Sequence, residues 1–384
     1  MPALSAHSAT LLPLPGLLAA RAAGPPRPLL VLGPCSAESA EQVLVTARAV
    51  KALGGDILRA GVWKPRSRPG AFEGAGLAAL EWLAAAKAET GLPIAVEVAT
   101  PQHVEAALRA GVDVPWLGAR TVVDPFRVQE LAEALRGTGV PVLVKNPVNP
   151  DVELWSGAIE RLRRAGIGQV GAVHRGFSTY APGGTGVEHY RNPPLWQLAI
   201  ELRRRHPDVP LLCDPSHMGG RRDLIGPLSQ RALDLAYDGL MIETHPDPDR
   251  ALSDAKQQLT PAALAAVLAA LIVREPESAA ATYAPRADEL RRRIDAADRD
   301  LVEALAARMR TVGEIGVHKK THGVTVHQPE RWADIFGTRT RWADDLGLRP
   351  EFVQQLYELI HLESIRTQTD AAQSSTRSGS DTLS

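Results

Sequence analysis

The sequence predicts an α/β protein in which a (β/α)8 barrel is followed by a small all-α domain. Short β-branched runs alternate with amphipathic helical stretches across residues 29–272, and eight such runs match the strand count of the barrel. Beyond residue 285 the helical pattern continues without a strand signal. The structural alternative, a doubly wound open sheet, usually has a glycine-rich turn after its first strand, and the turn Gly33-Pro34-Cys35-Ser36 lacks that pattern.

Each expected strand is a short aliphatic or β-branched run that leads at once into polar residues. The eight strands are predicted at Leu29–Leu32, Asp56–Ala60, Ile94–Val98, Pro115–Leu117, Pro141–Lys145, Gln169–His174, Pro210–Cys213 and Leu240–Glu243. A helix over Leu264–Ile272 is expected to close the barrel, which would then occupy residues 29–272.

Composition limits the compartment and the partners. At 384 residues and 45% hydrophobic, the chain can form two or three domains with a substantial core. A net charge of -1 argues against nucleic acid, and no apolar run is long enough for a membrane helix. Residues 1–28 are proline-rich and lack a basic start or a clear cleavage site, so we expect a flexible arm and no signal peptide. Two cysteines favour a reducing, cytoplasmic location.

The composition changes at Val273. Residues 273–285 have the composition of a linker, and residues 286–369 carry apolar side chains at helical spacing in three segments. The first segment, a long charged amphipathic helix, cannot bury its apolar face alone, which favours a homodimer or a higher homo-oligomer. Residues 370–384 are expected to be disordered because they are rich in Ser, Thr and other polar residues.

The predicted strand ends carry metal-binding side chains. Asp214, His217, Glu243 and Asp254 follow the last two strands, and Cys35 follows the first. In this fold the active site lies at the carboxyl ends of the strands, so these groups are expected to converge. The predicted ligand set is Cys35, His217, Glu243 and Asp254. One thiolate, one imidazole and two carboxylates suit a divalent transition ion, and they do not choose among Mn, Fe, Co and Zn.

Cations dominate the remaining strand ends. They are Arg59, Lys64, Arg66, Arg120, Lys145 and Arg175, and Glu97 ends the third strand. Arginine matches phosphate and carboxylate oxygens bidentately, and lysine adds a compact charge that can donate a proton. Any one of these residues could be a solvated loop charge. Together they predict one or two phosphorylated acids as substrates.

The long helix also places cations on one face. Arg308 and Lys319 are about three turns apart, and Arg291 lies roughly a quarter turn off their face. If two such helices pair antiparallel, Arg291 of one could reach Arg308 and Lys319 of the other. The pattern alone leaves open whether these residues bind a ligand or are solvated charges on a dimerisation helix.

Residues 29–271 resemble 3-deoxy-D-arabino-heptulosonate 7-phosphate (DAHP) synthase, in the short metal-dependent form related to 3-deoxy-octulosonate phosphate synthase. The matching motifs are GPCS at 33–36, KPRS at 64–67, GAR at 118–120, KN at 145–146, HRG at 174–176, DPSH at 214–217, IExH at 242–245 and SD at 253–254. Two of these motifs separate the sister families, because the octulosonate enzymes usually carry an asparagine near the Lys64-Pro65-Arg66 position and many have one in place of Cys35.

The resemblance implies condensation of phosphoenolpyruvate with erythrose 4-phosphate, an early step of the shikimate pathway, with a metal held by the four ligands above. Phosphoenolpyruvate would be bound by Arg59, Lys64, Arg120, Lys145 and Arg175, and the phosphate of erythrose 4-phosphate by Arg66 and Ser67. Glu97 is assigned to the substrate-binding set. The metal would polarise the aldehyde, Lys64 would protonate the alkoxide that forms, and Asp214 would orient substrate or water beside the metal.

Residues 286–369 resemble the all-helical chorismate mutase family, with LRRRIDAAD opening the long helix and ESIRTQ in the last one. The resemblance implies that Arg291 of a partner subunit grips the substrate carboxylates together with Arg308, Arg331 and Ser364. Lys319 and Gln368 would donate to the ether oxygen, where negative charge grows as the bond breaks. The sequence departs from the family at Gln328, where aspartate is frequent, and at Trp332, where glutamate often contacts the substrate hydroxyl.

These patterns leave three alternative functions for the chain. The first is a bifunctional enzyme that makes DAHP and converts chorismate to prephenate, with feedback in which prephenate at the helical domain closes or reorients it over the barrel mouth. In the second, the helical domain is mainly a module for dimerisation and for sensing chorismate or prephenate. The third, an octulosonate or sialate-type synthase, is disfavoured by the Lys-Pro-Arg-Ser motif at 64–67.

Overall fold

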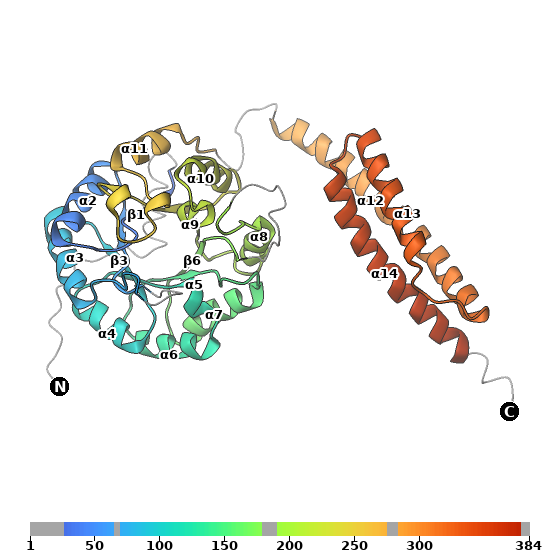
Figure 1. Cartoon of the computed structure of the whole chain (residues 1–384), viewed down its shortest axis with the longest axis horizontal. Coiled ribbons are helices and arrows are strands. Elements are labelled where there is room, and N and C mark those ends of the chain that lie inside the picture. Colours follow the sequence, from blue (N-terminus) through green and yellow to red (C-terminus); the bar gives the residue numbers. More distant parts are fainter. Residues whose placement is uncertain (1–26, 65–69, 179–189, 275–282, 378–384) are drawn as a thin grey trace. The chain divides into compact units, whose positions relative to one another are not determined.

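The structure, a computed structural model, describes residues 27–64, 70–178, 190–274 and 283–377. The chain divides into two compact units between Pro276 and Glu277 (Figure 1). This division falls inside the predicted linker 273–285, whose limits stay a prediction because residues 275–282 lie outside the described ones. Most of the predicted arm, residues 1–26, also lies outside them.

The first unit is a closed barrel of eight parallel strands that pair in sequence order, with β1 next to β8 (Figure 1). The strands are β1 (Leu29–Gly33), β2 (Ile57–Ala60), β3 (Ile94–Val98), β4 (Val114–Leu117), β5 (Val142–Lys145), β6 (Val170–His174), β7 (Leu211–Cys213) and β8 (Gly239–Glu243). The predicted fold class is confirmed, and every predicted strand matches an observed one to within one residue at each end.

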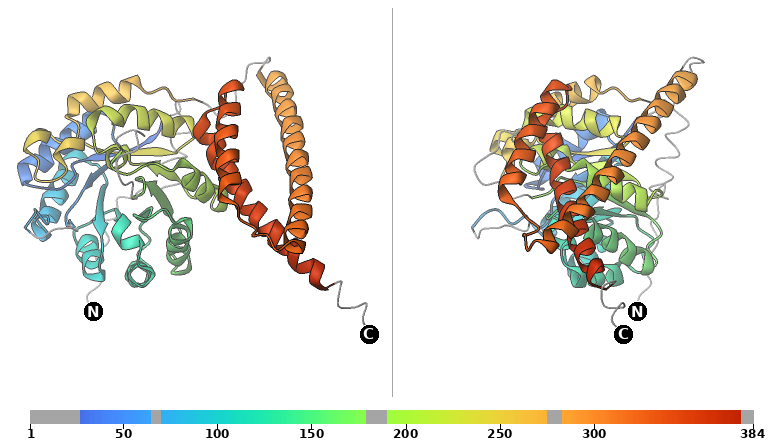
Figure 2. Two further views of the ribbon diagram at one scale, coloured as in Figure 1. Left: turned by 45° about the vertical axis from the view of Figure 1, so that its right-hand side comes forward. Right: turned by 90° about the vertical axis from the view of Figure 1, so that its right-hand side faces the viewer.

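Helices surround the sheet, as the side views in Figure 2 show. They are α2 (Ala40–Ala52), α3 (Leu77–Thr90), α4 (Pro101–Arg109), α5 (Ala119–Val122), α6 (Pro125–Leu135), α7 (Val152–Arg164), α8 (Trp196–Arg205), α9 (Pro215–Gly219), α10 (Ile225–Asp234) and α11 (Pro261–Ala270). Several begin at a residue whose side chain accepts a backbone N–H of the first turn, as Thr260 does for α11. This cap and Pro261 start α11 three residues before the predicted Leu264.

Two layers of side chains hold the barrel together. The larger layer lies between the strands and the helices and includes Leu58, Val96 and Leu240. The smaller one fills the interior with every second residue of the strands: Leu29, Val31, Ile57, Ala95, Val114, Trp116, Leu143, Val173, Leu212 and Met241. Because side chains alternate along a strand, the next inward position on each strand lies at its carboxyl end.

In its described residues, 283–377, the second unit forms the helices α12 (Tyr283–Thr321), α13 (Pro329–Asp345) and α14 (Pro350–Arg377). Helix α14 packs against both α12 and α13. Gly316 of α12 permits this contact, because a Cβ atom there would lie 2.7 Å from the backbone of Gln368. The prediction that disorder begins at residue 370 is wrong as far as Arg377, since α14 continues through Ala371 and Ala372, which favour a helix.

None of the helices among the described residues is both long and apolar enough to cross a membrane.

Candidate active site

The alternation along the strands carries charged side chains from the interior layer to the barrel mouth. Ile57, Ala95, Leu143, Leu212 and Met241 face the interior. Two residues further along the same strands come Arg59, Glu97, Lys145, Asp214 and Glu243. All five are buried or nearly so, with Arg59 at 1% and Glu243 at 0% exposure. The strand period therefore explains why one end of an apolar barrel bears a dense set of charges.

Cys35 enters the site from the turn after β1. Gly33 allows this turn to approach β2, because a Cβ atom on Gly33 would lie 2.0 Å from the carbonyl oxygen of Arg59. The backbone N–H of Cys35 donates to Oε1 of Gln258 at 2.9 Å. Burial raises the pKa of the Cys35 thiol to about 12, and repulsion from Glu243 adds to this effect. The thiol therefore keeps its proton unless a cation is bound nearby.

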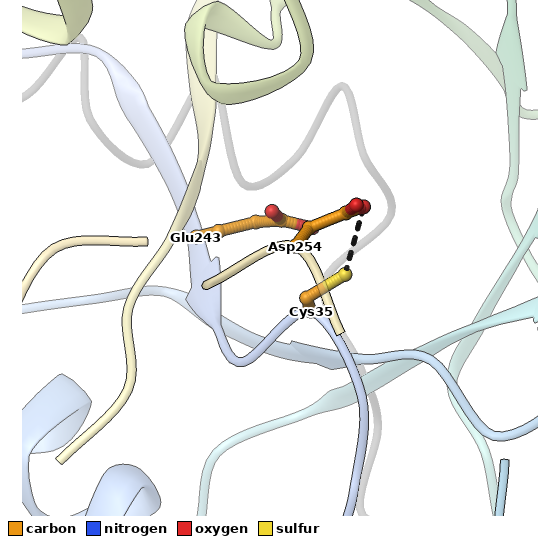
Figure 3. A group of neighbouring side chains, drawn as sticks. All are labelled: Cys35, Glu243 and Asp254. Atoms are coloured by element: carbon orange, nitrogen blue, oxygen red, sulfur yellow. Dashed lines mark hydrogen bonds between the residues drawn. The ribbon is translucent and has the colours of Figure 1, made fainter. Parts of the chain in front are cut away.

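Three of the four predicted metal ligands lie together. Cys35, Glu243 and Asp254 come from three segments and point toward one another (Figure 3), with their ligand atoms all within 4.8 Å. Cys35 Sγ donates to Oδ2 of Asp254 at 3.4 Å. His217, the fourth predicted ligand, lies beside this group, with Nε2 3.7 Å from Oε1 of Glu243. A buried thiol and two carboxylates at this separation are a donor set that a divalent cation would stabilise.

The backbone of Asp254 adopts a strained conformation at this point. Its φ angle of 47° lies in the left-handed region, which non-glycine residues rarely occupy. Arg191 Nη1 pairs with Oδ1 of Asp254 at 3.1 Å and donates to Oε1 of Gln257 at 2.7 Å. Gln257 Nε2 in turn donates to Oε2 of Glu243 at 2.6 Å. These contacts hold Asp254 beside the carboxylate of Glu243 and the thiol of Cys35.

Two cations partly offset the negative charge. Arg59 Nη1 donates to Oε1 of Glu243 at 3.0 Å, and Lys64 Nζ lies 3.0 Å from Cys35 Sγ. Burial raises the pKa of Glu243, but the charges of His217 and Arg59 outweigh it, so the net shift is downward. Glu243 therefore stays a carboxylate.

Asp214 links the ligand group to the cations of the mouth. It caps the short helix α9, where its Oδ1 accepts the backbone N–H of His217 at 3.1 Å. The imidazole Nδ1 of His217 lies 2.8 Å from Oδ2 of Asp214, and Lys145 Nζ pairs with the same oxygen at 2.8 Å. With Nδ1 bound in this way, Nε2 of His217 is the nitrogen that remains to meet a metal.

A cavity of about 380 Å³ opens over this group. Its lining is Lys64, Glu97, Ala119, Arg120, Lys145, Val148, Arg175, Ser178, Arg191, Asn192, His217 and Asp254. Seven of these were predicted from the sequence as site residues. Burial lowers the pKa of Arg175 to about 10, so the side chain still carries its charge at neutral pH. Five lysine and arginine side chains against two carboxylates make this a cavity for anions.

Glu97 is held at the edge of the cavity by its neighbours. Its Oε2 accepts the indole N–H of Trp116 at 3.1 Å. Gly118 leaves room for it, because a Cβ atom there would lie 2.1 Å from Oε1 of Glu97. Trp116 also lies beneath the cations, with Arg59 and Lys145 placed 5.1 Å and 5.6 Å from its ring centre.

The sequence did not point to every residue of the site. Arg191, Asn192 and Gln257 were missed because they follow no strand end, although the basic character of Arg191 was a signal that could have been used. Arg66 and Ser67, predicted to bind the second phosphate, lie outside the described residues.

In the helical unit, three predicted residues of α12 and α14 are joined by hydrogen bonds, and a fourth, Lys319, bonds further along α12. Arg308 Nη1 donates to Oγ of Ser364 at 2.7 Å, and Gln368 Nε2 donates to the carbonyl of Ser364 at 3.3 Å. Gln368 is buried, and its Oε1 has no partner within the described residues. Lys319 Nζ donates to the carbonyl of Val326 at 2.7 Å.

Three other positions that the sequence analysis singled out in the helical unit make different contacts. Arg291 and Arg331 are exposed, and Arg291 pairs with Asp288 of its own helix at 3.3 Å. At the departure from the family pattern, the Trp332 ring stacks on His361 with ring centres 4.0 Å apart. This arrangement places an aromatic wall where the family often has a carboxylate.

A closed (β/α)8 barrel with a buried thiol beside two carboxylates, below a cation-lined cavity, is typical of enzymes that act on anionic substrates. The chain belongs to the DAHP synthetase I family, whose model matches residues 19–276. The model of chorismate mutase type II matches residues 290–369.

Individual relatives agree with both assignments. The chain is 33% identical over 230 residues to phospho-2-dehydro-3-deoxyheptonate aldolase of Thermotoga maritima, which covers 60% of this chain and 64% of the relative. The match therefore spans less than two thirds of that relative. Its crystal structure matches with a TM-score of 0.56 and 30% identity, over 62% of this chain and 66% of that one.

Two further relatives cover the separate units. A 2-dehydro-3-deoxyphosphooctonate aldolase of Nitratidesulfovibrio vulgaris is 30% identical over 262 residues, 63% of this chain and 89% of the relative. The 4-amino-4-deoxychorismate mutase of Streptomyces pristinaespiralis is 37% identical over 83 residues, 22% of this chain and 64% of the relative.

Proposed function

We propose that the barrel condenses phosphoenolpyruvate with erythrose 4-phosphate to give DAHP and phosphate. The observation that carries this proposal is the position of the ligand group Cys35, Glu243 and Asp254 below a cavity lined by Lys64, Arg120, Lys145, Arg175 and Arg191. Two phosphorylated substrates need both the anion-binding charge and a group that polarises an aldehyde.

Cys35, His217, Glu243 and Asp254 would hold a divalent metal ion. When bound, the ion would supply Lewis acidity toward the aldehyde oxygen. The donor atoms fit such an ion because a buried thiol and two carboxylates lie within 4.8 Å of one another, and His217 Nε2 faces Glu243 at 3.7 Å. The donor set admits Mn, Fe, Co or Zn.

The cavity residues have distinct roles in the proposed reaction. Arg120, Lys145 and Arg175, with Arg59 below them, would bind the phosphate and carboxylate of phosphoenolpyruvate, and Glu97 would border the same site. Lys64 Nζ would donate its proton to the alkoxide oxygen that forms as the enol carbon attacks the aldehyde. A water molecule would then add to the cationic carbon that bears the phosphate, and phosphate would leave to give the ketone of DAHP. Asp214 would orient Lys145 and His217, to which it is bonded. Arg66 and Ser67 would take the phosphate of the aldehyde substrate.

The sugar substrate decides between the two sister reactions. We expect product formation and phosphate release with erythrose 4-phosphate, and at least a hundredfold lower kcat/KM with arabinose 5-phosphate. The reverse preference would make the barrel an octulosonate-type synthase. Phosphate release measured side by side with the two sugars, in protein reloaded with each of the four metals, tests the assignment.

For the helical unit we propose conversion of chorismate to prephenate, and its substrate site needs a second copy of the chain. Arg308, Arg331, Ser364, Lys319 and Gln368 would come from one subunit. Lys319 Nζ and Gln368 would donate to the ether oxygen, where charge develops in the transition state. Gln368 Nε2 donates to the carbonyl of Ser364 at 3.3 Å, and it would turn from this carbonyl to the ether oxygen when a substrate enters. Arg291 would reach the substrate from the other copy.

The proposed homodimer rests on the apolar face of α12. Ile294, Leu301 and Val302 are 51% to 62% exposed in the single chain, which leaves this stretch of helix without a core. A second α12 would cover it and carry the partner subunit's Arg291 toward Arg308. Sedimentation equilibrium of the full chain tests this arrangement, for which a monomer at micromolar concentration is the contrary result.

The second candidate makes the helical unit mainly a dimerisation module that senses chorismate or prephenate, and the Trp332–His361 stack favours it because it occupies the position of a substrate-binding carboxylate. Chorismate consumption by the full chain, with 4-amino-4-deoxychorismate as a second substrate, separates catalysis from sensing.

In either case prephenate would close or reorient the helical unit over the barrel mouth, and it should then lower the DAHP synthase rate. An unchanged rate at saturating prephenate would refute this feedback.

A further inference from the structure

The segments that carry the proposed metal ligands meet a second time behind the site, around the carboxylate of Glu38. Ser36 directly follows the ligand Cys35, and Ser253 directly precedes the ligand Asp254. The side chain of Glu38 is only 10% exposed. It is not among the described residues that line the cavity, so its buried charge does not contact a substrate there.

One oxygen of Glu38 joins two of the ligand segments. Oε1 accepts the hydroxyl of Ser36 at 3.1 Å and the backbone N–H of Leu252 at 2.9 Å. The hydroxyls of Ser36 and Ser253 lie 2.5 Å apart and share a further hydrogen bond. The turn of Cys35 and the loop of Asp254, more than two hundred residues apart in sequence, are therefore tied directly.

The other oxygen faces the third ligand segment. His245, two residues after Glu243, places Nε2 3.5 Å from Oε2 of Glu38. Nδ1 of His245 accepts the backbone N–H of Asp247 at 3.0 Å, which leaves Nε2 as the nitrogen that faces Glu38. Glu38 itself is fixed from α2, because its backbone N–H donates to Oε1 of Gln42 at 3.1 Å.

We propose that Glu38 is a positioning residue of the metal site, whose carboxylate holds the segments of Cys35, Glu243 and Asp254 at the separation that the ion needs. The inference rests on the metal site of the proposed function. Before a cation binds, the carboxylates of Glu243 and Asp254 repel each other, and Asp254 is held in a strained backbone conformation. A fixed contact behind the ligands keeps the loops from moving apart. Groups that orient metal ligands in this way typically change metal affinity by about 10- to 100-fold when removed.

The test measures Mn²⁺ affinity of the chelator-treated full chain by competition with a fluorescent chelator. Glu38→Gln keeps the shape of the side chain and removes its charge, and we expect Mn²⁺ binding to weaken by about 10- to 100-fold. Ser253→Ala breaks one hydrogen bond of the cluster and should weaken binding by a smaller factor. Glu41→Gln, at an exposed position in the first turn of α2 just after Glu38, is the matched control and should bind as the wild type does.

A second readout distinguishes positioning from a general loss of structure. At saturating Mn²⁺ the KM for phosphoenolpyruvate of Glu38→Gln should equal that of the wild type, because Glu38 lies outside the cavity. Equal Mn²⁺ affinity of the wild type and Glu38→Gln would overturn the inference. If Glu38→Gln fails to fold, wild-type affinity in a folded Ser253→Ala protein would overturn it as well. A wild type that binds Mn²⁺ but forms no DAHP would refute only the proposed reaction, and the affinity comparison would still decide the role of Glu38.

Discussion

The amino group of Lys64 lies 3.0 Å from the thiol sulfur of Cys35 and 3.1 Å from the carbonyl oxygen of the same residue. A proton donor and a proposed metal ligand are thus in direct contact at the cavity floor. Burial lowers the pKa of Lys64, but the neighbouring Cys35 and Glu243 outweigh burial and raise it overall. The amino group therefore carries its proton when the substrates enter.

Lys64→Gln should lower kcat of DAHP formation by about a hundredfold or more, because the alkoxide would lose its proton donor. Rapid-quench measurement of product formation at saturating metal checks this effect. Lys51→Gln, an exposed lysine at the end of α2, is the control and should leave kcat unchanged. A Lys64→Gln enzyme with wild-type kcat would show that another group supplies the proton.

The two cysteines offer a matched pair for the metal site. Both are buried, but Cys213 belongs to the layer between strands and helices, where its sulfur lies 3.8 Å from that of Met218. Cys35→Ser should therefore lose most of its metal affinity and its DAHP synthase activity, whereas Cys213→Ser should keep both. Chelator treatment should abolish wild-type activity, and a divalent transition ion should restore it. Metal content by mass spectrometry, together with activity, provides the measurement. Activity in a metal-free Cys35→Ser protein would exclude the proposed ligand set.

The close approach of α12 and α14 makes Gly316 sensitive to any side chain. Gly316→Ala should destabilise the helical unit by about 1–3 kcal/mol, because the new methyl group would overlap the backbone of Gln368. Gly313→Ala, one turn earlier, meets its nearest atoms at 3.9 Å and should be neutral or slightly stabilising. Thermal unfolding followed by circular dichroism compares the two variants. DAHP formation by the barrel should be retained in both, and equal melting temperatures would contradict the close packing.

His174 should make barrel stability depend on pH. Burial lowers its pKa to about 3, and its Nδ1 lies 2.8 Å from the hydroxyl of Tyr237. The ring stays neutral in the folded chain but takes up a proton in the unfolded chain below about pH 6.5. The folded state therefore loses stability as the pH falls through this window, by about 2 kcal/mol at pH 5 relative to pH 8.

The comparison is between the wild type and His174→Asn. Urea unfolding of the full chain at a series of pH values, followed by tryptophan fluorescence, should show a shallower loss of stability in the variant. Parallel curves for the two proteins would mean that His174 does not titrate on unfolding in the way described.

Much of the barrel could be predicted because its signals are local and periodic. The run Ile94–Val98 matches β3 at both ends, and the two-residue alternation that buries Met241 also brings Glu243 to the mouth. The start of β7 was predicted at Pro210, one residue before the observed start at Leu211. A proline lacks the N–H that a strand residue donates, so the strand begins at the residue after it.

The conformations of the loops were harder to predict from the sequence. Nothing in the sequence indicates that Asp254 has a positive φ angle or that Arg191 reaches its carboxylate, because both depend on how two distant loops pack. The end of α14 was missed for a different reason. Composition predicted disorder from residue 370, whereas a helix that already packs on its neighbours needs only moderate propensity to extend a further two turns.

The interleaving of core and site residues on the same strands restricts how this chain can vary. In β5, Val144 packs toward the helices and Lys145 toward the cavity. Deleting one residue within β5 would exchange these directions, placing a lysine in the apolar layer and a valine under the substrate. A loss of activity and a loss of stability would thus arise together from one change of register. Insertions and deletions are therefore tolerated in the connections that follow each strand. The length of each strand is constrained both by core packing and by the placement of the site residues.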